Sequence, residues 1–207
     1  MEHPDHCDDL PDFLAVDRAL GITGAWDIFH KLKWEYAQFR ELSEVNHSLD
    51  LEDRVSLRRP MYAAINTAAT AWSLVEWIWR EAQADHQVLR RLVALVGEEA
   101  AKTPRQLKEW ARENDDLEAC HQIAHQSKHG DMRKPNEKFS TRVNMWYPKD
   151  PDGRSGWRQT GYVVWQTEDG KKESSINNVF VRVLQHWDRI LDQLQIVERM
   201  ISSATVD

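Results

Sequence analysis

The sequence predicts a mainly α-helical protein: an antiparallel helical bundle with a small three-stranded antiparallel β-meander inserted before the last helix. Through most of the chain, apolar residues recur at alternating steps of three and four, which is typical of helices that bury one face. Between residues 139 and 175 the pattern changes to alternation with turn signals, which indicates antiparallel strands. The length of 207 residues, with 41% apolar and 29% charged residues, suits one domain. We therefore expect a single domain over residues 1–207, beginning with a flexible acidic arm at 1–11.

Two long helices are expected at 24–45 and 55–83, after a short one at 12–20. The second long helix, which contains MYAAINTAATAWSLVEWIW, is apolar or small on nearly every face. A helix of this kind is central and buried in its domain. Glu76 lies on its apolar stripe one turn after Trp72, so its carboxylate needs a partner, because an unpaired buried charge is costly.

Three shorter helices follow, each marked by a start or stop signal. The segment 85–96 should be helical and end at Gly97. Thr103 followed by a proline is a standard start signal for a helix at 104–113. The next helix should begin at Asp115 or Asp116 and end at Gly130, because glycine commonly closes a helix.

The β-meander is expected over residues 139–175. FSTRVNMWY at 139–147 alternates in character, and GYVVWQT at 161–167 is β-branched and aromatic. Asp169-Gly170 is a strong two-residue hairpin turn that leads into a third strand, KKESSI.

The last helix has the clearest period in the chain. Its apolar residues form a sustained heptad seam, which favours either a helix in the bundle core or a homodimer seam. At about 1.5 Å per residue, the helix would be roughly 40 Å long. The residues of the seam are Ile176, Phe180, Val183, Trp187, Ile190, Leu194, Val197 and Ile201.

Charge and cysteine content limit the classes of function. The net charge of −7 argues against general nucleic-acid binding by the whole surface. Residues 128–142, however, carry five Lys/Arg against two Asp/Glu, and Arg133 and Lys134 are candidates for binding an anion or a phosphate backbone. Two cysteines imply no disulfide framework. Neither a signal peptide nor a run of about 20 apolar residues is present, so we expect a cytoplasmic protein without a membrane partner.

The segment EACHQIAHQSKHG at 118–130 carries three histidines four residues apart, His121, His125 and His129. On a helical wheel of about 100° per residue, these histidines lie from the flank towards the outer face. The residues expected on the buried face are Leu117, Cys120, Ile123, Ala124 and Ser127.

A shared metal ion is not expected on this helix. The outer pair, His121 and His129, is eight residues apart, or about 12 Å along the axis, which is too far for one ion bound at about 2 Å. A metal-dependent enzyme using two of the histidines would need acidic ligands from elsewhere, and no HExxH-like group supplies them. The sequence also lacks GxSxG, P-loop and GxGxxG motifs at suitable positions, so no motif supports serine or cysteine nucleophile chemistry. We expect no cofactor.

The long second helix, the later helix that ends in a polar-His-Gly sequence, and the long terminal helix together resemble the HEPN superfamily of small helical domains. The resemblance implies a homodimer in a bacterial toxin or defence context. It also implies, for active members, a metal-independent ribonuclease that uses an arginine and a histidine at a helix end. QIAHQSKHG lacks an arginine five to seven residues before either His125 or His129. Glu76-Trp77 and Ser127-Lys128-His129 are also similar to a pairing in uncharacterised bacterial relatives of this kind.

Two functional hypotheses follow. In the first, the protein is an RNA- or partner-binding module in which Glu76 pairs with Lys128 or His129, and His125 contributes to binding together with Arg133 and Lys134. In the alternative, it is a metal-independent ribonuclease: His129 acts as general acid and base on a 2′-hydroxyl and Lys128 stabilises the phosphate charge, with Glu76 as a third catalytic candidate. Whether the protein is an enzyme stays open at this point.

Overall fold

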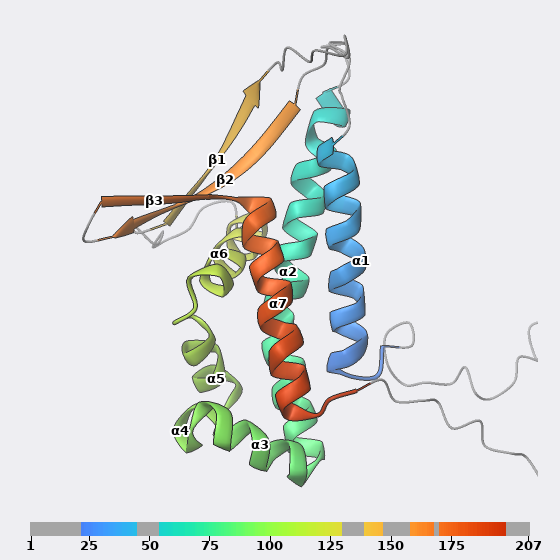
Figure 1. Cartoon of the computed structure of the whole chain (residues 1–207), viewed down its shortest axis with the longest axis vertical. Coiled ribbons are helices and arrows are strands. Elements are labelled where there is room, and N and C mark those ends of the chain that lie inside the picture. Colours follow the sequence, from blue (N-terminus) through green and yellow to red (C-terminus); the bar gives the residue numbers. More distant parts are fainter. Residues whose placement is uncertain (1–21, 45–53, 130–138, 147–157, 168–169, 198–207) are drawn as a thin grey trace, which may run out of the picture.

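The computed structural model describes residues 22–44, 54–129, 139–146, 158–167 and 170–197. Within these ranges the chain forms a helical bundle with a three-stranded antiparallel sheet between the sixth and seventh helices, as the sequence predicted (Figure 1). The helices are α1 (Ala25–Glu44), α2 (Arg54–Ala84), α3 (His86–Val96), α4 (Glu98–Ala101), α5 (Pro104–Ala111), α6 (Asp115–His129) and α7 (Ile176–Leu194). The strands are β1 (Phe139–Trp146), β2 (Arg158–Thr167) and β3 (Gly170–Ser175).

The longest helix, α2, is the centre of the bundle. It contacts α1, α3, α5, α6 and α7, and in Figure 1 it runs the height of the bundle behind α7. Alanines at positions 64, 68, 71 and 82 are buried along it, so neighbouring helices approach its backbone closely. The prediction of a central, buried second helix is confirmed.

Local capping explains why the shorter helices begin where they do. Thr103 Oγ1 accepts a hydrogen bond from the backbone N–H of Gln106 at 3.2 Å, with Pro104 at the first helical position of α5. The Asn114 Oδ1 accepts from the N–H groups of Asp116 and Leu117 at 3.0 and 3.1 Å and so starts α6. These caps satisfy amide groups that have no partner within the helix.

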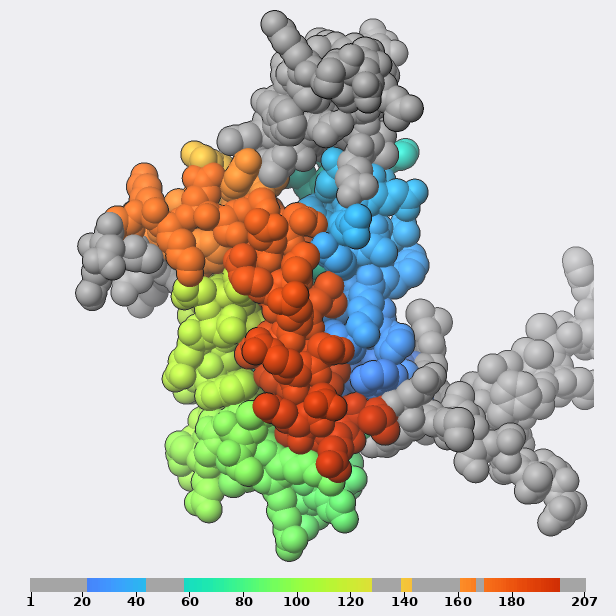
Figure 2. Space-filling model, in the orientation of Figure 1, coloured from blue at the N-terminus to red at the C-terminus, as the bar shows by residue number. Residues whose placement is uncertain are grey.

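The last helix, α7, lies along the bundle between α1 and α6 (Figure 2). Its seam residues from Ile176 to Leu194 are buried inside this chain, which confirms the interpretation as a core helix and leaves that stripe unavailable as a dimer seam. The predicted continuation of this helix through residue 201 is wrong, because the helix ends at Leu194. Gln195 is left-handed at φ 54°, and the Leu194 carbonyl accepts from Arg91 Nη1 of α3 at 3.1 Å. At about 1.5 Å per residue, α7 is about 28 Å long and not roughly 40 Å.

The sheet has the order β1-β2-β3, with Phe139 opposite Trp165 in the first pair of strands and Thr167 opposite Gly170 in the second. Val163 and Trp165 are buried, and β2 contacts both α1 and α7. Gly161 permits this approach, since a Cβ atom there would lie 2.5 Å from Ile176 Cδ1.

Replacing Gly161 with alanine is therefore expected to lower the free energy of unfolding by about 1–2 kcal/mol, because the new methyl group overpacks the contact between β2 and α7. The Gly161→Ala/Ile176→Val double variant removes the clashing Cδ1 and should be less destabilised than the sum of the two single variants. Urea unfolding of the four proteins measures this. Additive losses would contradict the packing explanation.

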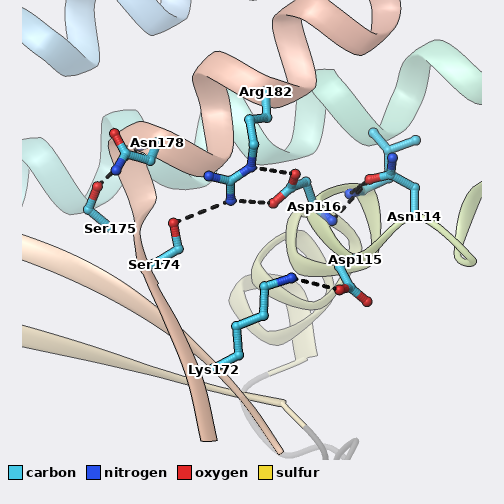
Figure 3. Close-up of polar contacts among 9 residues, drawn as sticks. Asn114, Asp115, Asp116, Lys172, Ser174, Ser175, Asn178 and Arg182 are labelled. Atoms are coloured by element: carbon cyan, nitrogen blue, oxygen red, sulfur yellow. Dashed lines mark hydrogen bonds and ion pairs between the residues drawn. The ribbon is translucent and has the colours of Figure 1, made fainter. Parts of the chain in front are cut away.

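Ion pairs join the sheet and α7 to the start of α6 (Figure 3). Arg182 on α7 donates two hydrogen bonds to the Asp116 carboxylate, at 2.8 and 2.7 Å, and one to Ser174 Oγ at 3.3 Å. Lys172 on β3 donates to Asp115 at 3.2 Å. The inserted sheet is thus fixed to the helix that carries the histidines.

Several expectations concern residues outside the described ranges: the acidic arm at 1–11, the short helix at 12–20, the glycine cap at Gly130, and Ile201. Within the part of the chain that the structure describes, none of the helices combines the length and the apolar character that a membrane span requires.

Candidate functional site

A cleft of about 480 Å³ opens between α2, α5 and α6. Its walls are polar and aromatic, and three of its residues are cationic. The lining residues are Trp72 from α2, Arg105, Lys108, Glu109 and Arg112 from α5 and the residue after it, and His121, Ala124 and His125 from α6.

Three rings form one side of the cleft. The rings of Trp72 and His121 lie 4.5 Å apart between centroids and are inclined by 38°. The ring of His125, one turn further along α6, lies 5.8 Å from that of His121. His121 is partly buried, with a side chain 22% exposed, whereas His125 is exposed, as their predicted positions on the flank and the outer face imply.

Behind His121 lies Glu118, whose carboxylate accepts hydrogen bonds from Arg112, Gln122 and His121. Arg112 donates from Nε at 2.7 Å and from Nη2 at 3.2 Å, which is a two-point contact between guanidinium and carboxylate. The amide of Gln122 donates at 2.7 Å, and Nδ1 of His121 lies 3.2 Å from Glu118 Oε2.

Glu118 is ionised at neutral pH. Burial alone would raise the pKa of its carboxyl, but the hydrogen bonds from His121, Arg112 and Gln122 outweigh burial and lower the pKa to about 2. An ionised carboxylate only accepts hydrogen bonds, so Nδ1 of His121 must carry the proton. In the neutral imidazole, Nε2 is then the nitrogen with a free lone pair.

The three cations at the cleft are each paired with an acid but keep unused donors. Lys108 pairs with Glu76 on α2, and Arg105 Nε donates to Glu109 at 3.0 Å. A lysine has three N–H donors and an arginine five, so these contacts leave several donors available to a ligand. Because both pairs are substantially exposed, they are weak enough for a phosphate to compete with them.

The predicted site residues have different outcomes. Glu76 has the partner that it was expected to need, but the partner is Lys108, and Glu76 is half-exposed rather than buried. His125 lines the cleft. Lys128 and His129 belong to the last turn of α6, where the structure describes the backbone and not the side chains. Arg133 and Lys134 lie outside the described residues.

The helical wheel of α6 is correct on its central face and wrong at its edges. Leu117, Cys120 and their neighbours Ile123 and Ala124 are buried, but Ser127 is exposed. Ala119 and Gln122 are also buried, which widens the covered arc because α2 and α7 both pack on this helix.

The expected role of Cys120 as a core residue is confirmed. Its side chain is fully buried, and burial, with a smaller effect from Asp116, raises the pKa of its thiol. A thiol that stays protonated is a poor nucleophile.

Arg105, Lys108, Arg112 and Glu118 were not predicted as site residues, and Trp72 was placed only on the apolar stripe of its helix. The spacing of the three cations places them on one side of the segment 105–112, which was a readable signal. Glu118 stands three residues before His121, at a distance that allows contact on a helix.

Among the described residues, no group of three or more His, Cys, Asp or Glu side chains could hold a metal ion. Comparisons with protein-family models, with curated proteins and with solved structures gave no match.

Proposed function

We propose that this protein binds single-stranded RNA and that the cleft between α2, α5 and α6 is its binding site. The observation that supports this most is the indole of Trp72 inside a cleft bordered by Arg105, Lys108 and Arg112. Proteins that bind single strands combine such an aromatic surface, on which a base stacks, with cations that follow the phosphates.

The charge distribution favours local rather than general binding. The chain carries a net charge of −7, so its surface as a whole repels a polyanion. The free N–H donors of Lys108 and Arg112 lie on the same cleft as the rings, where one nucleotide could use both. The volume of about 480 Å³ is in the range of small-ligand sites.

The wider context is part of the same proposal. The resemblance and the sequence support a HEPN-like relation, a bacterial toxin or defence role, a cytoplasmic location and a homodimer. A dimer would need a face other than the stripe of α7, since that stripe is buried within this chain. Sedimentation equilibrium of the purified protein tests the dimer.

A second candidate function is the metal-independent ribonuclease that uses His129 and Lys128. What favours it is the course of α6, whose backbone continues for one turn beyond His125 to His129, about 6 Å along the axis. An RNA strand in the cleft could reach that helix end.

RNA binding is testable by fluorescence anisotropy with a labelled single-stranded RNA oligonucleotide in EDTA. Trp72→Leu and Lys108→Gln are each expected to weaken binding by about tenfold, since a stacked base contributes about 1–3 kcal/mol and a charge-assisted hydrogen bond a similar amount. Arg90→Gln, an exposed change on α3 outside the cleft, is the control and should leave affinity unchanged. Equal losses in all three variants, or an oligonucleotide that the unmodified protein does not bind, would contradict the proposal.

A further inference from the structure

The cleft contains groups that binding alone does not require. Glu118 holds the ring of His121 by its Nδ1, at 3.2 Å, while Trp72 packs against the ring at 4.5 Å between centroids. The ring is therefore fixed in orientation and in tautomer, with its Nε2 able to accept a proton.

A neutral imidazole held in this way is suited to act as a general base. Hydrolases of several unrelated folds use the same arrangement, in which a carboxylate orients a histidine and stabilises the imidazolium that forms. Here the carboxylate is itself fixed by Arg112 and Gln122, so it stays ionised and in place.

A second imidazole stands next to the first. His125 lies on the same wall, exposed to the cleft, with its ring centroid 5.8 Å from that of His121. Two imidazole rings this close on one wall of the cleft can both contact the same phosphate group, one to remove a proton and the other to supply one. Lys108 and Arg112 line the same cleft and can stabilise charge on the phosphate oxygens.

Resting on the proposed RNA binding, we propose that the cleft cleaves its bound RNA, with His121 as general base, His125 as general acid and Glu118 as the positioning residue for His121. Nε2 of His121 takes the proton of a ribose 2′-hydroxyl, and the 2′-oxygen forms a bond to the adjacent phosphorus. The bond from phosphorus to the 5′-oxygen breaks, and that oxygen takes a proton from the imidazolium of His125. The products are a 2′,3′-cyclic phosphate and a 5′-hydroxyl, and exchange of protons with water restores both histidines.

This assignment differs from both earlier expectations. It uses no arginine five to seven residues before the catalytic histidine, which the resemblance implies and which is absent before His121, His125 and His129. It also assigns the chemistry to His121 and His125, whereas the hypothesis from the sequence assigned it to His129 and Lys128. The two sets of residues can therefore be separated by substitution.

The test measures cleavage and binding separately, in EDTA. Cleavage uses a labelled single-stranded RNA, with the 2′,3′-cyclic phosphate as the detected product. Binding uses the 2′-O-methyl form of the same oligonucleotide, which lacks the attacking hydroxyl. His121→Phe keeps a ring against Trp72. His121→Phe and His125→Gln are each expected to slow cleavage at least about 100-fold, while the affinity for the 2′-O-methyl strand changes by less than about threefold.

The positioning role of Glu118 has its own readout. Glu118→Gln, assayed at a temperature at which circular dichroism shows it folded, should lower kcat at least about tenfold and leave KM nearly unchanged. His30→Ala, an exposed histidine on α1 outside the cleft, is the control and should cleave like the unmodified protein.

Each other outcome overturns the inference. Binding of the 2′-O-methyl strand without cleavage of the RNA would remove the catalytic inference and leave the proposed function standing. Absence of both would remove both. Cleavage that survives in His121→Phe and is lost in His129→Ala would transfer the chemistry to the end of α6. Equal cleavage by every variant would indicate a contaminating nuclease.

Discussion

Replacement of Glu118 by glutamine is expected to lower the free energy of unfolding at pH 7 by up to about 3 kcal/mol. The pKa of this carboxyl is lowered from its ordinary value of 4.5 to about 2 in the folded protein. One pKa unit corresponds to about 1.4 kcal/mol of preference for the ionised form, and the side chain is only 12% exposed, so solvent screens its contacts little. Urea unfolding of the two proteins, followed by circular dichroism, measures the difference.

The effect should depend on pH in a defined direction. Because the carboxyl binds its proton more weakly in the folded than in the unfolded protein, its stabilising contribution is complete above pH 4.5 and is lost as the pH falls to about 2. The difference between the unmodified protein and Glu118→Gln should therefore be full at pH 5 and close to zero at pH 2. Glu109→Gln removes an exposed acid from the same cleft and is the matched control, with little effect at either pH. A Glu118→Gln effect that is constant with pH would refute the charge-based explanation.

Most of the fold was predictable because its boundaries are set by residues close in sequence. Thr103 caps α5 through the amide of Gln106, three residues away. The hairpin at Gly170 uses the glycine's positive φ of 124°. Signals of this kind act within one turn of the chain, and they are written in the sequence itself.

The end of α7 was not predictable for the opposite reason. The apolar period continues past Gln195, and nothing local stops the helix there. The chain nevertheless turns, and Ile196 is buried while Val197 is 65% exposed. Arg91 on α3 contacts the Leu194 carbonyl at that point. A contact across 103 residues is tertiary information that a periodic pattern does not contain.

The same distinction applies to the candidate site: positions on one helix were predictable, and contacts between helices were not. That His121 and His125 face outward follows from spacing on one helix. The groups around them come from other helices: Trp72 from α2, Lys108 from α5, and Arg112 from just after α5. Glu76 illustrates the limit, because the sequence indicated that it needs a partner and could not identify Lys108, 32 residues away.

Trp187→Ala is expected to be the most destabilising of these changes, with a loss of about 3–5 kcal/mol. Trp187 is 1% exposed on α7, and it lines a small apolar cavity together with residues of α2, α3 and α5, among them Ile78, Leu92 and Leu107. The cavity left by the indole cannot close without moving several helices, which is why the cost exceeds the loss of transferred area. Urea unfolding measures it, with Trp34→Ala as the matched control, since that tryptophan is 64% exposed.

The same variant separates the two interpretations of the heptad seam. If the stripe of α7 were a dimer seam, Trp187→Ala would weaken association, and its effect on the unfolding midpoint would change with protein concentration. Since the stripe is buried inside one chain, the loss of stability should be the same at two protein concentrations about fiftyfold apart.

Trp187→Phe tests whether the packed ring or the indole N–H group stabilises this part of the core. The indole Nε1 is buried without a hydrogen-bond partner among the described residues, so phenylalanine removes an unsatisfied donor while keeping most of the volume. It should therefore cost clearly less than alanine. A phenylalanine variant as unstable as the alanine variant would mean that the N–H group, and not the packed ring, stabilises this part of the core.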